Sequence, residues 1–580
     1  MMNKEPYNNR IRYVMAAATV VTLCGPVVCR TDPAPSVSDV WGYRAVAVLA
    51  VLAMTAVCLG RRLPRLHWAD GVALFWWVAV SLNFLFLPSF PAAEVYGEAT
   101  AMMVAYMSLR LIVPYCGRAF TRFWRIGLCL AGGYELWKGG MQLAGCEASR
   151  HHLFGVTGTF FNPGPYAVFV AVVLAVAVAL WYRAVKDRTG YGRWGKAGIW
   201  SVGALTVVGI PVLVATWSRT AWLALAIAVA CLLWHRHRRA VLAGVAVAAV
   251  AGVAVYFLKQ GSADGRWLMT AVAGRAWTEA WLTGHGLGSY VHAYGEAQAA
   301  FFAARPGSPL AGVAGSPEFA FNGLLGVAVE QGLAGIVPAL CLGVWSLAAL
   351  WRRDEVTAAG WLVLLVASQF SYPFALWPFR LMAAGWLAMA VSGAAGTVPG
   401  RWWKKAVALP PAVVAMVWIW DLSAGMAHKV AVYESFRRIS GIQDAAFLDD
   451  YEEMYKDLYA SPDFLFTFGK ALQAVGRHND SNAVLHQGTM VSCDPMFHVL
   501  IGNNYRALGA PAEAEKAYTK AFDMLPDRLY PLYRLMGLYQ SVGRTDKARQ
   551  TARRIVALKP KVDSPAVREM KAEAWQLINH

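Results

Sequence analysis

The sequence predicts an all-α protein, in which a bundle of membrane-spanning helices is followed by a stack of water-exposed helical repeats. Hydrophobic residues make up 57% of the 580 residues and charged residues only 15%, a balance typical of chains that cross a membrane many times. Long apolar segments fill residues 1–425, whereas residues 426–580 are more polar and repeat themselves. We therefore expect a membrane domain at 1–425 and a helical-repeat domain at 426–580.

The apolar segments of the first domain each have a length near the ~20 residues that cross a bilayer, so they predict about 12–13 transmembrane helices. They occupy 13–29, 42–60, 71–90, 99–116, 126–145, 165–183, 197–216, 221–234, 240–258, 323–350, 357–374, 379–397 and 406–425. Residues 259–322 form one long polar loop between two of them.

Positive charge distinguishes the two sides of the predicted membrane domain. The connections near residues 4–12, 61–65, 118–125, 183–196, 236–239, 352–353 and 401–405 hold 22 Lys and Arg residues, and the alternating connections hold seven. Because Lys and Arg resist translocation, the basic connections and the N-terminus are expected in the cytoplasm. The loop 259–322 and the repeat domain then face the outer side of the membrane. The net charge of +18 is explained by loops lying against anionic membrane lipids, so we expect no nucleic-acid partner.

The second domain contains an internal repeat of 34 residues. Tyr505, Gly509, Ala514 and Pro526 recur as Tyr539, Gly543, Ala548 and Pro560. This period, with small residues where two helices cross and Pro after the second helix, resembles the tetratricopeptide repeat. The copies lie at 495–527 and 529–561, with a weaker copy at 461–494. Stacked repeats form a groove for a protein partner, although some serve only as scaffolds.

Two short motifs lie at the outer ends of predicted helices. Residues 158–164 read GTFFNPG, in which Asn162 and the following Pro favour a turn that starts a helix. Ser218 and Arg219 occupy a tight connection between two spans. An Arg at the membrane boundary can bind phosphate oxygens in a bidentate fork, and the alternative is that it reaches out to lipid head groups.

The long loop holds further candidates. Arg266 is a second outer guanidinium, and His285 and His292 can accept a proton near neutral pH. Gly286 and Gly288, within the sequence GHGLG, permit turns that bring backbone amides close to an anion. Ordinary loop residues are the alternative for each of these.

The tenth apolar segment begins with three polar candidates. Glu318 lies just before it, and Asn322 is expected to cap the helix. Glu330 lies eight residues further on, ~12 Å along the helix axis at 1.5 Å per residue. An ionisable side chain at that depth is a functional candidate unless a structural ion pair explains it.

Five short elements occur in this order along the chain: GTFFNP, SRT, GR, GHGLG and N-x7-E-x-G-x2-G. With them, about residues 1–400 resemble the O-antigen ligase and O-antigen polymerase superfamily. The resemblance implies a GT-C-like membrane glycosyltransferase that needs neither metal nor cofactor. Such proteins take a glycan from an undecaprenyl diphosphate carrier and join it to lipid A core, another glycan or a protein hydroxyl.

By that resemblance, Arg219 and Arg266 hold the donor's diphosphate. Many ligases of the superfamily have His as the acceptor base immediately before the Asn that corresponds to Asn322, but this chain has Phe321 there. The remaining candidate bases are His285, which we favour, and His292, Glu318 and Glu330.

The predicted site therefore falls into two sets. The catalytic residues are Arg219, Arg266, His285 and Glu330, and the substrate-binding residues are Asn162, Ser218, Gly286, Gly288, His292, Glu318 and Asn322. A polymerase, a protein O-oligosaccharyltransferase and, from a different class, a polysaccharide transporter remain alternative functions.

Overall fold

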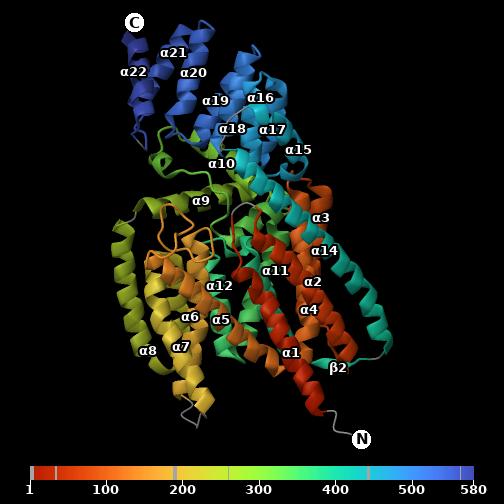
Figure 1. The fold of residues 1–580 in the computed structure, drawn as a ribbon. Helices are drawn as coiled ribbons and strands as arrows, with labels where there is room; N and C mark the ends of the chain where they lie inside the picture. Colours follow the sequence, from red (N-terminus) through yellow and green to blue (C-terminus); the bar gives the residue numbers. More distant parts are fainter. Residues whose placement is uncertain are drawn as a thin grey trace.

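The computed structural model describes residues 5–32, 35–186, 193–258, 260–400, 402–440, 445–561 and 563–579, and it consists almost entirely of helices (Figure 1). The predicted all-α class is confirmed. Within these ranges the only strands are β1 (Arg62–Pro64) and β2 (Thr397–Pro399), which pair antiparallel.

The first thirteen helices belong to the bundle and its outer cover. They are α1 (Glu5–Cys24), α2 (Val37–Leu59), α3 (Trp68–Phe86), α4 (Ala92–Cys116), α5 (Arg118–Leu143), α6 (Pro163–Lys186), α7 (Arg193–Ala215), α8 (Arg219–Leu258), α9 (Gln260–Glu279), α10 (Tyr290–Ala303), α11 (Gly323–Trp351), α12 (Glu355–Ala367) and α13 (Trp377–Ala395). Short 3-10 helices lie at Gly25–Val27, Pro309–Val313 and Pro373–Ala375.

Seven helical segments in the described part of the chain are long and apolar enough to cross a membrane, so this is a multi-pass membrane protein. They are Val37–Leu59, Trp68–Phe86, Ala92–Cys116, Pro163–Val185, Ala197–Ala215, Gly323–Trp351 and Leu409–Ile439, with shorter apolar helices at Arg219–Trp234 and Glu355–Ala367. The 12–13 spans predicted from the sequence stay a prediction, because this number counts helices by length and composition alone. The predicted spans at 13–29, 126–145 and 379–397 correspond to α1, α5 and α13, which pack against one another and their neighbours. Helices covered in this way need less apolar surface than helices that face lipid.

The predicted segments 221–234 and 240–258 both lie within α8. The backbone leaves helical geometry at His237 (φ −126°, ψ 37°), so α8 is two helices joined at a kink. Of the basic connection near 183–196, residues 187–192 lie outside the described residues. The same is true of residue 259 at the start of the predicted long loop.

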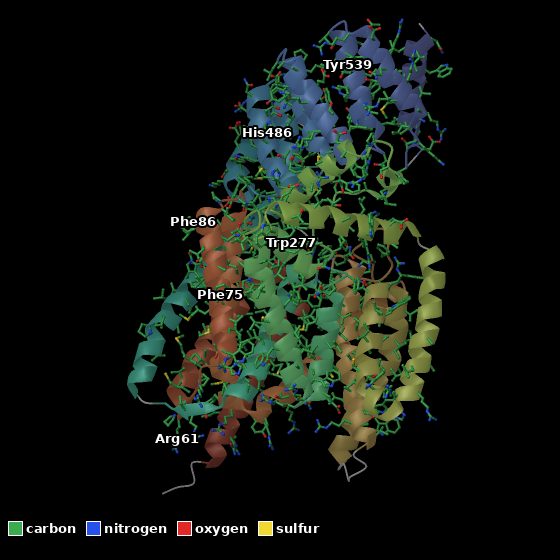
Figure 2. All side chains as sticks on the ribbon, turned by 180° about the vertical axis from the view of Figure 1, so that it is seen from behind. Arg61, Phe75, Phe86, Trp277, His486 and Tyr539 are labelled. Atoms are coloured by element: carbon green, nitrogen blue, oxygen red, sulfur yellow. The ribbon has the colours of Figure 1, made fainter. Side chains whose placement is uncertain are left out.

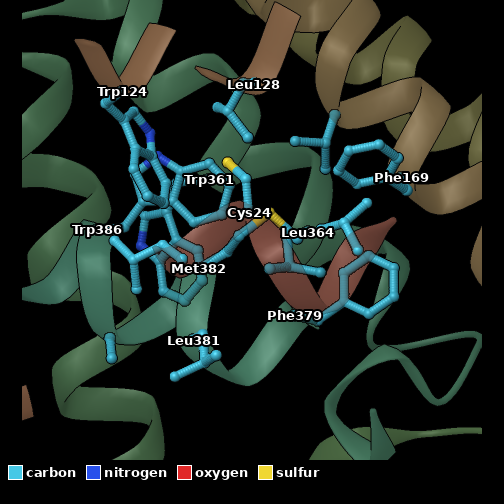
Figure 3. Close-up of a cluster of buried hydrophobic side chains, with 14 of the residues drawn as sticks. Cys24, Trp124, Leu128, Phe169, Trp361, Leu364, Phe379, Leu381, Met382 and Trp386 are labelled. Carbon is cyan, nitrogen blue, oxygen red and sulfur yellow. The ribbon is translucent and has the colours of Figure 1, made fainter. Parts of the chain in front are cut away.

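Aromatic side chains fill the centre of the bundle (Figure 3). Trp386 of α13 lies between Trp124 of α5 and Trp361 of α12, with ring centroids 5.3 and 5.5 Å apart. The indole nitrogens of Trp386 and Trp361 donate hydrogen bonds to Thr357 O and Ser346 Oγ, at 3.0 and 2.9 Å. Buried Trp residues need such acceptors, so these contacts fix how α11, α12 and α13 pack.

Helix α14 (Trp402–Ile439) runs along the bundle beside α2 and leads to a stack of helices at one end (Figure 1). The helices of the stack are α15 (Leu448–Leu458), α16 (Pro462–Ala474), α17 (His478–Val491), α18 (Pro495–Ala507), α19 (Pro511–Met524), α20 (Leu529–Ser541), α21 (Thr545–Ala557) and α22 (Pro565–Asn579), with a 3-10 turn at Ala445–Phe447. The helix pairs α16–α17, α18–α19 and α20–α21 coincide with the three predicted repeats. Small residues allow the close crossings: Gly502 lies against Tyr518, and Ser481 Oγ donates to Gly469 O at 2.6 Å.

The predicted long loop is mostly helical, because α9 and α10 lie within it. Helix α10 packs on α19 and α17 of the stack, and Gln298 Nε2 donates to Met524 O at 2.8 Å. Helix α14 runs unbroken through the predicted boundary at residue 425. The stack is therefore fixed to the bundle at two places.

The two ends of the molecule carry different parts of the chain. Arg61 lies at the end that carries the N-terminus, and His486 and Tyr539 lie at the opposite end (Figure 2). The loop after α5 belongs to the repeat-domain end, because its Arg150 shares a cavity with Asp463 of α16.

We expect Cys146, in that loop, to react with a membrane-impermeant maleimide in intact spheroplasts. In a Leu66→Cys variant, position 66 should react only after the membrane is opened. Cys146 is exposed, as is Leu66 at 82%, so only the membrane distinguishes them. Mass spectrometry of the digested protein measures labelling at each position. Labelling of position 66 in spheroplasts, without labelling of Cys146, contradicts the predicted orientation.

Candidate functional site

Two Arg side chains predicted from separate motifs lie close together. Arg219 is the first residue of α8, and Arg266 lies on α9. Arg266 Nη1 donates to Thr220 Oγ1 at 3.2 Å, which ties α9 to the start of α8. Burial and the neighbouring charge of Arg219 lower the pKa of Arg266. Two partly buried guanidinium groups held together in this way favour an anion between them.

Arg266 lines a small cavity of about 40 Å³. Asn322, Phe321, Tyr290 and Gln369 also line it. Asn322 caps α11, because its Oδ1 accepts a hydrogen bond from Leu325 N–H at 3.0 Å, as the sequence predicts. Phe321, where the sequence resemblance leads us to expect a His, therefore lines the same cavity as Arg266 and presents a phenyl ring.

The backbone next to Arg219 is strained. Trp217 adopts φ 53°, in the left-handed region that non-Gly residues rarely occupy. The following residue, Ser218, donates its backbone N–H to Thr216 Oγ1 at 3.3 Å. This tight turn brings the start of α8 to the surface where α9 crosses. Ser218 lies beside the Arg pair because it directly precedes Arg219 in the sequence.

Helix α11 is broken at Gly332, where φ is 60° and ψ is −150°. The segment 281–286 lies against the break and replaces the lost helical hydrogen bonds. His285 N–H donates to Val329 O at 2.8 Å, and Leu333 N–H donates to Trp281 O at 3.0 Å. An added Cβ at Gly332 would meet the backbone of Leu282 at 2.4 Å. Only glycine fits at this contact.

Glu330 and His285 both support this contact rather than the Arg pair. The Glu330 carboxylate accepts backbone hydrogen bonds from Gly288 and Tyr290, which holds the start of α10. His285 Nε2 lies 2.7 Å from Ala276 O and donates to it. That tautomer uses one ring nitrogen for a structural bond. The structure therefore does not bring these two predicted catalytic residues to the Arg266 cavity.

The remaining loop candidates are also engaged within the protein. Gly286 and Gly288 have φ of 105° and 73°, and their Cβ positions would meet Leu87 O and Pro91. Gly286 N–H donates to Glu330 O at 3.2 Å. His292 Nδ1 lies 3.0 Å from Thr489 O of α17, so this His fastens α10 to the repeat stack. Neither the glycines nor His292 line the Arg266 cavity.

The GTFFNPG motif is held by two buried polar side chains of α5. Glu135 accepts hydrogen bonds from Thr159 N–H and Oγ1 at 3.1 and 2.8 Å, and Gln142 Oε1 accepts from the N–H groups of Thr157 and Gly158. Asn162 Oδ1 then accepts from Gly164 N–H at 2.9 Å, at the start of α6. The predicted turn is confirmed, and its rigid support places Asn162 at the mouth of a cavity.

That cavity is polar, has a volume of about 470 Å³ and lies where the bundle meets the repeat stack. It brings together Asn162 and Glu318, which the sequence predicts separately. Burial, together with the nearby Asp463, raises the pKa of Glu318. The structure thus divides the predicted site into an Arg219–Arg266–Asn322 group and an Asn162–Glu318 group. We call the second space the junction cavity.

A third space is an apolar groove of about 550 Å³ between α3, α4, α11, α12 and α13. Trp76, Met103, Leu340 and Leu387 are among the side chains that line it. Gln369 lines both this groove and the Arg266 cavity. Gln369 is therefore a wall that the groove and the Arg266 cavity share.

Sequence reasoning missed Gln369 and Tyr372. Both lie at the outer end of the predicted span 357–374, where the run Gln-Phe-Ser-Tyr interrupts the apolar pattern. That interruption was the available signal, since polar residues at the end of a span often face a cavity. Among the described residues, no group of three or more His, Cys, Asp or Glu is placed to hold a metal ion.

Fold and site define a multi-pass membrane protein with cavities at the end that carries a helical-repeat tail. The tetratricopeptide repeat family matches residues 505–574, from α18 into α22, and confirms the predicted repeats in the C-terminal part. No curated protein matches the chain.

The close approach at the α11 break is testable by adding one methyl group. We expect Gly332→Ala to lower the free energy of unfolding by about 1–3 kcal/mol, because alanine disfavours φ 60° and its Cβ meets the Leu282 backbone. The unfolding midpoint of the purified protein in detergent measures this. The control is Gly140→Ala in α5, where nothing lies within 4 Å of the added Cβ. Equal midpoints for the two variants contradict the contact.

Proposed function

We propose that the protein is a membrane glycosyltransferase of the O-antigen ligase type. It takes a glycan from undecaprenyl diphosphate and joins it to a hydroxyl acceptor at the periplasmic face of a bacterial inner membrane. The observation that carries this proposal is the apolar groove that shares the wall residue Gln369 with the cavity of Arg266, beside Arg219.

The groove supports the choice of a lipid-linked donor. Its apolar walls open among membrane helices and suit a polyprenyl chain. A diphosphate attached to that chain reaches the Arg266 cavity, where charge and donor geometry fit phosphate oxygens. Asn322, on the opposite wall, adds a polar side chain at the same place.

The Arg pair supports the chemistry of the donor. When the bond between the sugar and the diphosphate breaks, negative charge develops on the leaving phosphate oxygen. Guanidinium groups fixed before the reaction stabilise that charge in a site with little water. Arg219 is at the start of α8 and Arg266 is held by Thr220, so neither must reorganise during the step.

The repeat tail supports a protein partner. Tetratricopeptide repeats serve in protein–protein interaction, and the stack here lies at one end of the bundle (Figure 1), where Asp463 of α16 lines the junction cavity. Such a partner would bring other enzymes or an acceptor to the site. The donor chemistry is shared by a polymerase and by a protein O-oligosaccharyltransferase, so the groove and the Arg pair leave both as alternatives.

We expect Arg219→Ala and Arg266→Ala each to lower glycan transfer at least a hundredfold, because each removes one preorganised charge from the leaving group. The assay uses full-length protein in lipid vesicles with undecaprenyl diphosphate-linked glycan extracted from a deletion strain. Mass spectrometry detects the new covalent product, which a transporter would not form.

Arg275→Ala is the matched control, since Arg275 lies on the same helix α9, is exposed and pairs only weakly with Glu279 at 3.8 Å. It should transfer glycan at the wild-type rate, and all three variants should reach the membrane in equal amounts. Full activity of both Arg219→Ala and Arg266→Ala rules out the diphosphate assignment.

A further inference from the structure

Helix α9 crosses the bundle at the end that carries the repeat stack, and one of its faces is uncovered (Figure 1). The other face packs on α10, on α11 and on the 3-10 helix at Pro309–Val313, where Leu268, Val272 and Ala276 are buried. Gly274 lies on the uncovered face, and nothing is within 4 Å of a Cβ added to it. The helix therefore presents a second face to the surroundings of the protein.

Large apolar side chains mark the uncovered face. Trp267 of α9 is 60% exposed, and Trp281, in the turn after α9, is 55% exposed. The neighbouring Leu282 is exposed as well. A helix that faces water carries mostly charged and polar side chains on its outer face. The composition of this face is therefore not that of a helix surrounded by water.

The exposed threonines of α9 add little polarity. The hydroxyl groups of Thr270 and Thr278 donate to carbonyl oxygens four and three residues earlier in the same helix, at 2.9 and 2.7 Å. Hydroxyls satisfied in this way do not need water. Helical spacing puts the exposed charges, Arg275 and Glu279, at one border of the apolar face, where they pair at 3.8 Å. An apolar face bordered by charge is the arrangement of helices that lie in a membrane interface.

The apolar face continues into the membrane helices at the start of α9. Arg266, next to Trp267, is bonded to Thr220 of α8. Trp217, in the turn just before α8, is exposed. Val214 of α7 is also exposed, and it belongs to a helix long and apolar enough to cross the membrane.

The other end of the face is continuous with membrane helices too. The turn after α9 lies against the break of α11 at Gly332, and it accepts a hydrogen bond from Asn83 of α3 at 2.8 Å. Exposed apolar side chains follow along both helices, at Val337 of α11 and Phe86 of α3. Figure 2 shows Phe86 and Trp277 of α9 at the same end of the bundle. Both ends of the face thus join surfaces that the membrane covers.

We propose that the uncovered face of α9 binds the surface of the phospholipid bilayer on the side of the repeat stack, with Trp267 and Trp281 at the level of the head groups. Indole suits this level because its ring is apolar and its N–H is polar. The 20 residues of α9 then lie along the membrane for ~30 Å rather than across it. The bilayer thereby takes part in fixing Arg266, which directly precedes Trp267. Such a contact is open to an enzyme and to a transporter alike, so it goes beyond the proposed function.

Photo-crosslinking tests the contact in the wild-type protein. The full chain is placed in phosphatidylcholine vesicles in which some lipids carry a diazirine near the glycerol end of one acyl chain. Trypsin cleaves after Arg266 and Arg275, which releases residues 267–275 as one peptide. After irradiation this peptide should carry the mass of the lipid. Residues 507–516, an equally small tryptic peptide from the repeat stack, are the control and should carry none.

Spin labels measure the depth of the same face. Trp267→Cys and Trp281→Cys are made in full-length protein whose exposed cysteines are replaced by Ala, and each is labelled with a nitroxide. Oxygen concentrates in lipid and a nickel chelate stays in water. The ratio of oxygen to nickel collisions at both positions should be about fivefold higher than at Gln550→Cys, an exposed site on α21. Val337→Cys on α11 gives the value for a position within the membrane.

Two results overturn the assignment. Collision ratios at 267 and 281 equal to the ratio at 550 show that water covers the face. Rare collisions with both reagents, without lipid on residues 267–275, show that a protein covers it, either a second copy of this chain or another partner. Neither measurement involves glycan transfer, so the membrane contact and the proposed function stand or fall separately.

Discussion

The break in α11 is the constraint on which the arrangement of the site depends. Inside a membrane, each unpaired backbone group costs several kcal/mol, so a helix can be interrupted only where other groups replace its hydrogen bonds. The segment 281–286 does so at both sides of Gly332. The same segment follows α9, which carries Arg266, and the first half of α11 begins at Asn322. The contact at the break thereby fixes the two walls of the Arg266 cavity relative to each other. Glu330 adds to this contact, because its carboxylate binds the backbone at the start of α10.

The three spaces follow an order of increasing polarity. The groove among α3, α4, α11, α12 and α13 is apolar, the Arg266 cavity is small and cationic, and the junction cavity carries both signs of charge. Gln369 joins the first to the second, and the Phe161–Tyr372–Phe321 rings join the second to the third. A lipid-linked donor matches the first two spaces in the same order, with an apolar chain followed by an anionic diphosphate. This correspondence supports the proposed donor more strongly than any single residue does.

The sequence predicts local features of this structure better than contacts between distant segments. The repeats follow from a period in Gly, Ala, Tyr and Pro, and the caps at Asn162 and Asn322 follow from neighbouring residues. Residue types also single out Arg219 and Arg266, which lie close together where α9 meets the start of α8. The partners of Glu330 and His285 could not be predicted, because they are backbone groups at the start of α10 and near the end of α9 that only the fold brings close. Gly286 and Gly288 adopt the tight turns that the sequence predicts. Glycine is needed there because a Cβ would meet Leu87 and Pro91, and these close contacts could not be predicted.

The contacts of the repeat stack indicate that it acts as part of the site rather than as a detachable tail. Asp463 of α16 lines the junction cavity. Helix α14 lines the same cavity and continues into it from the bundle without a break. His292 and Gln298 of α10 bond to the backbone of Thr489 and Met524, and α10 itself is held by Glu330 at the break in α11. A partner that shifts the stack must therefore move a cavity wall, the start of α10, or both. Binding at the repeats and the shape of the cavities are then coupled through the packing of α10 and α16.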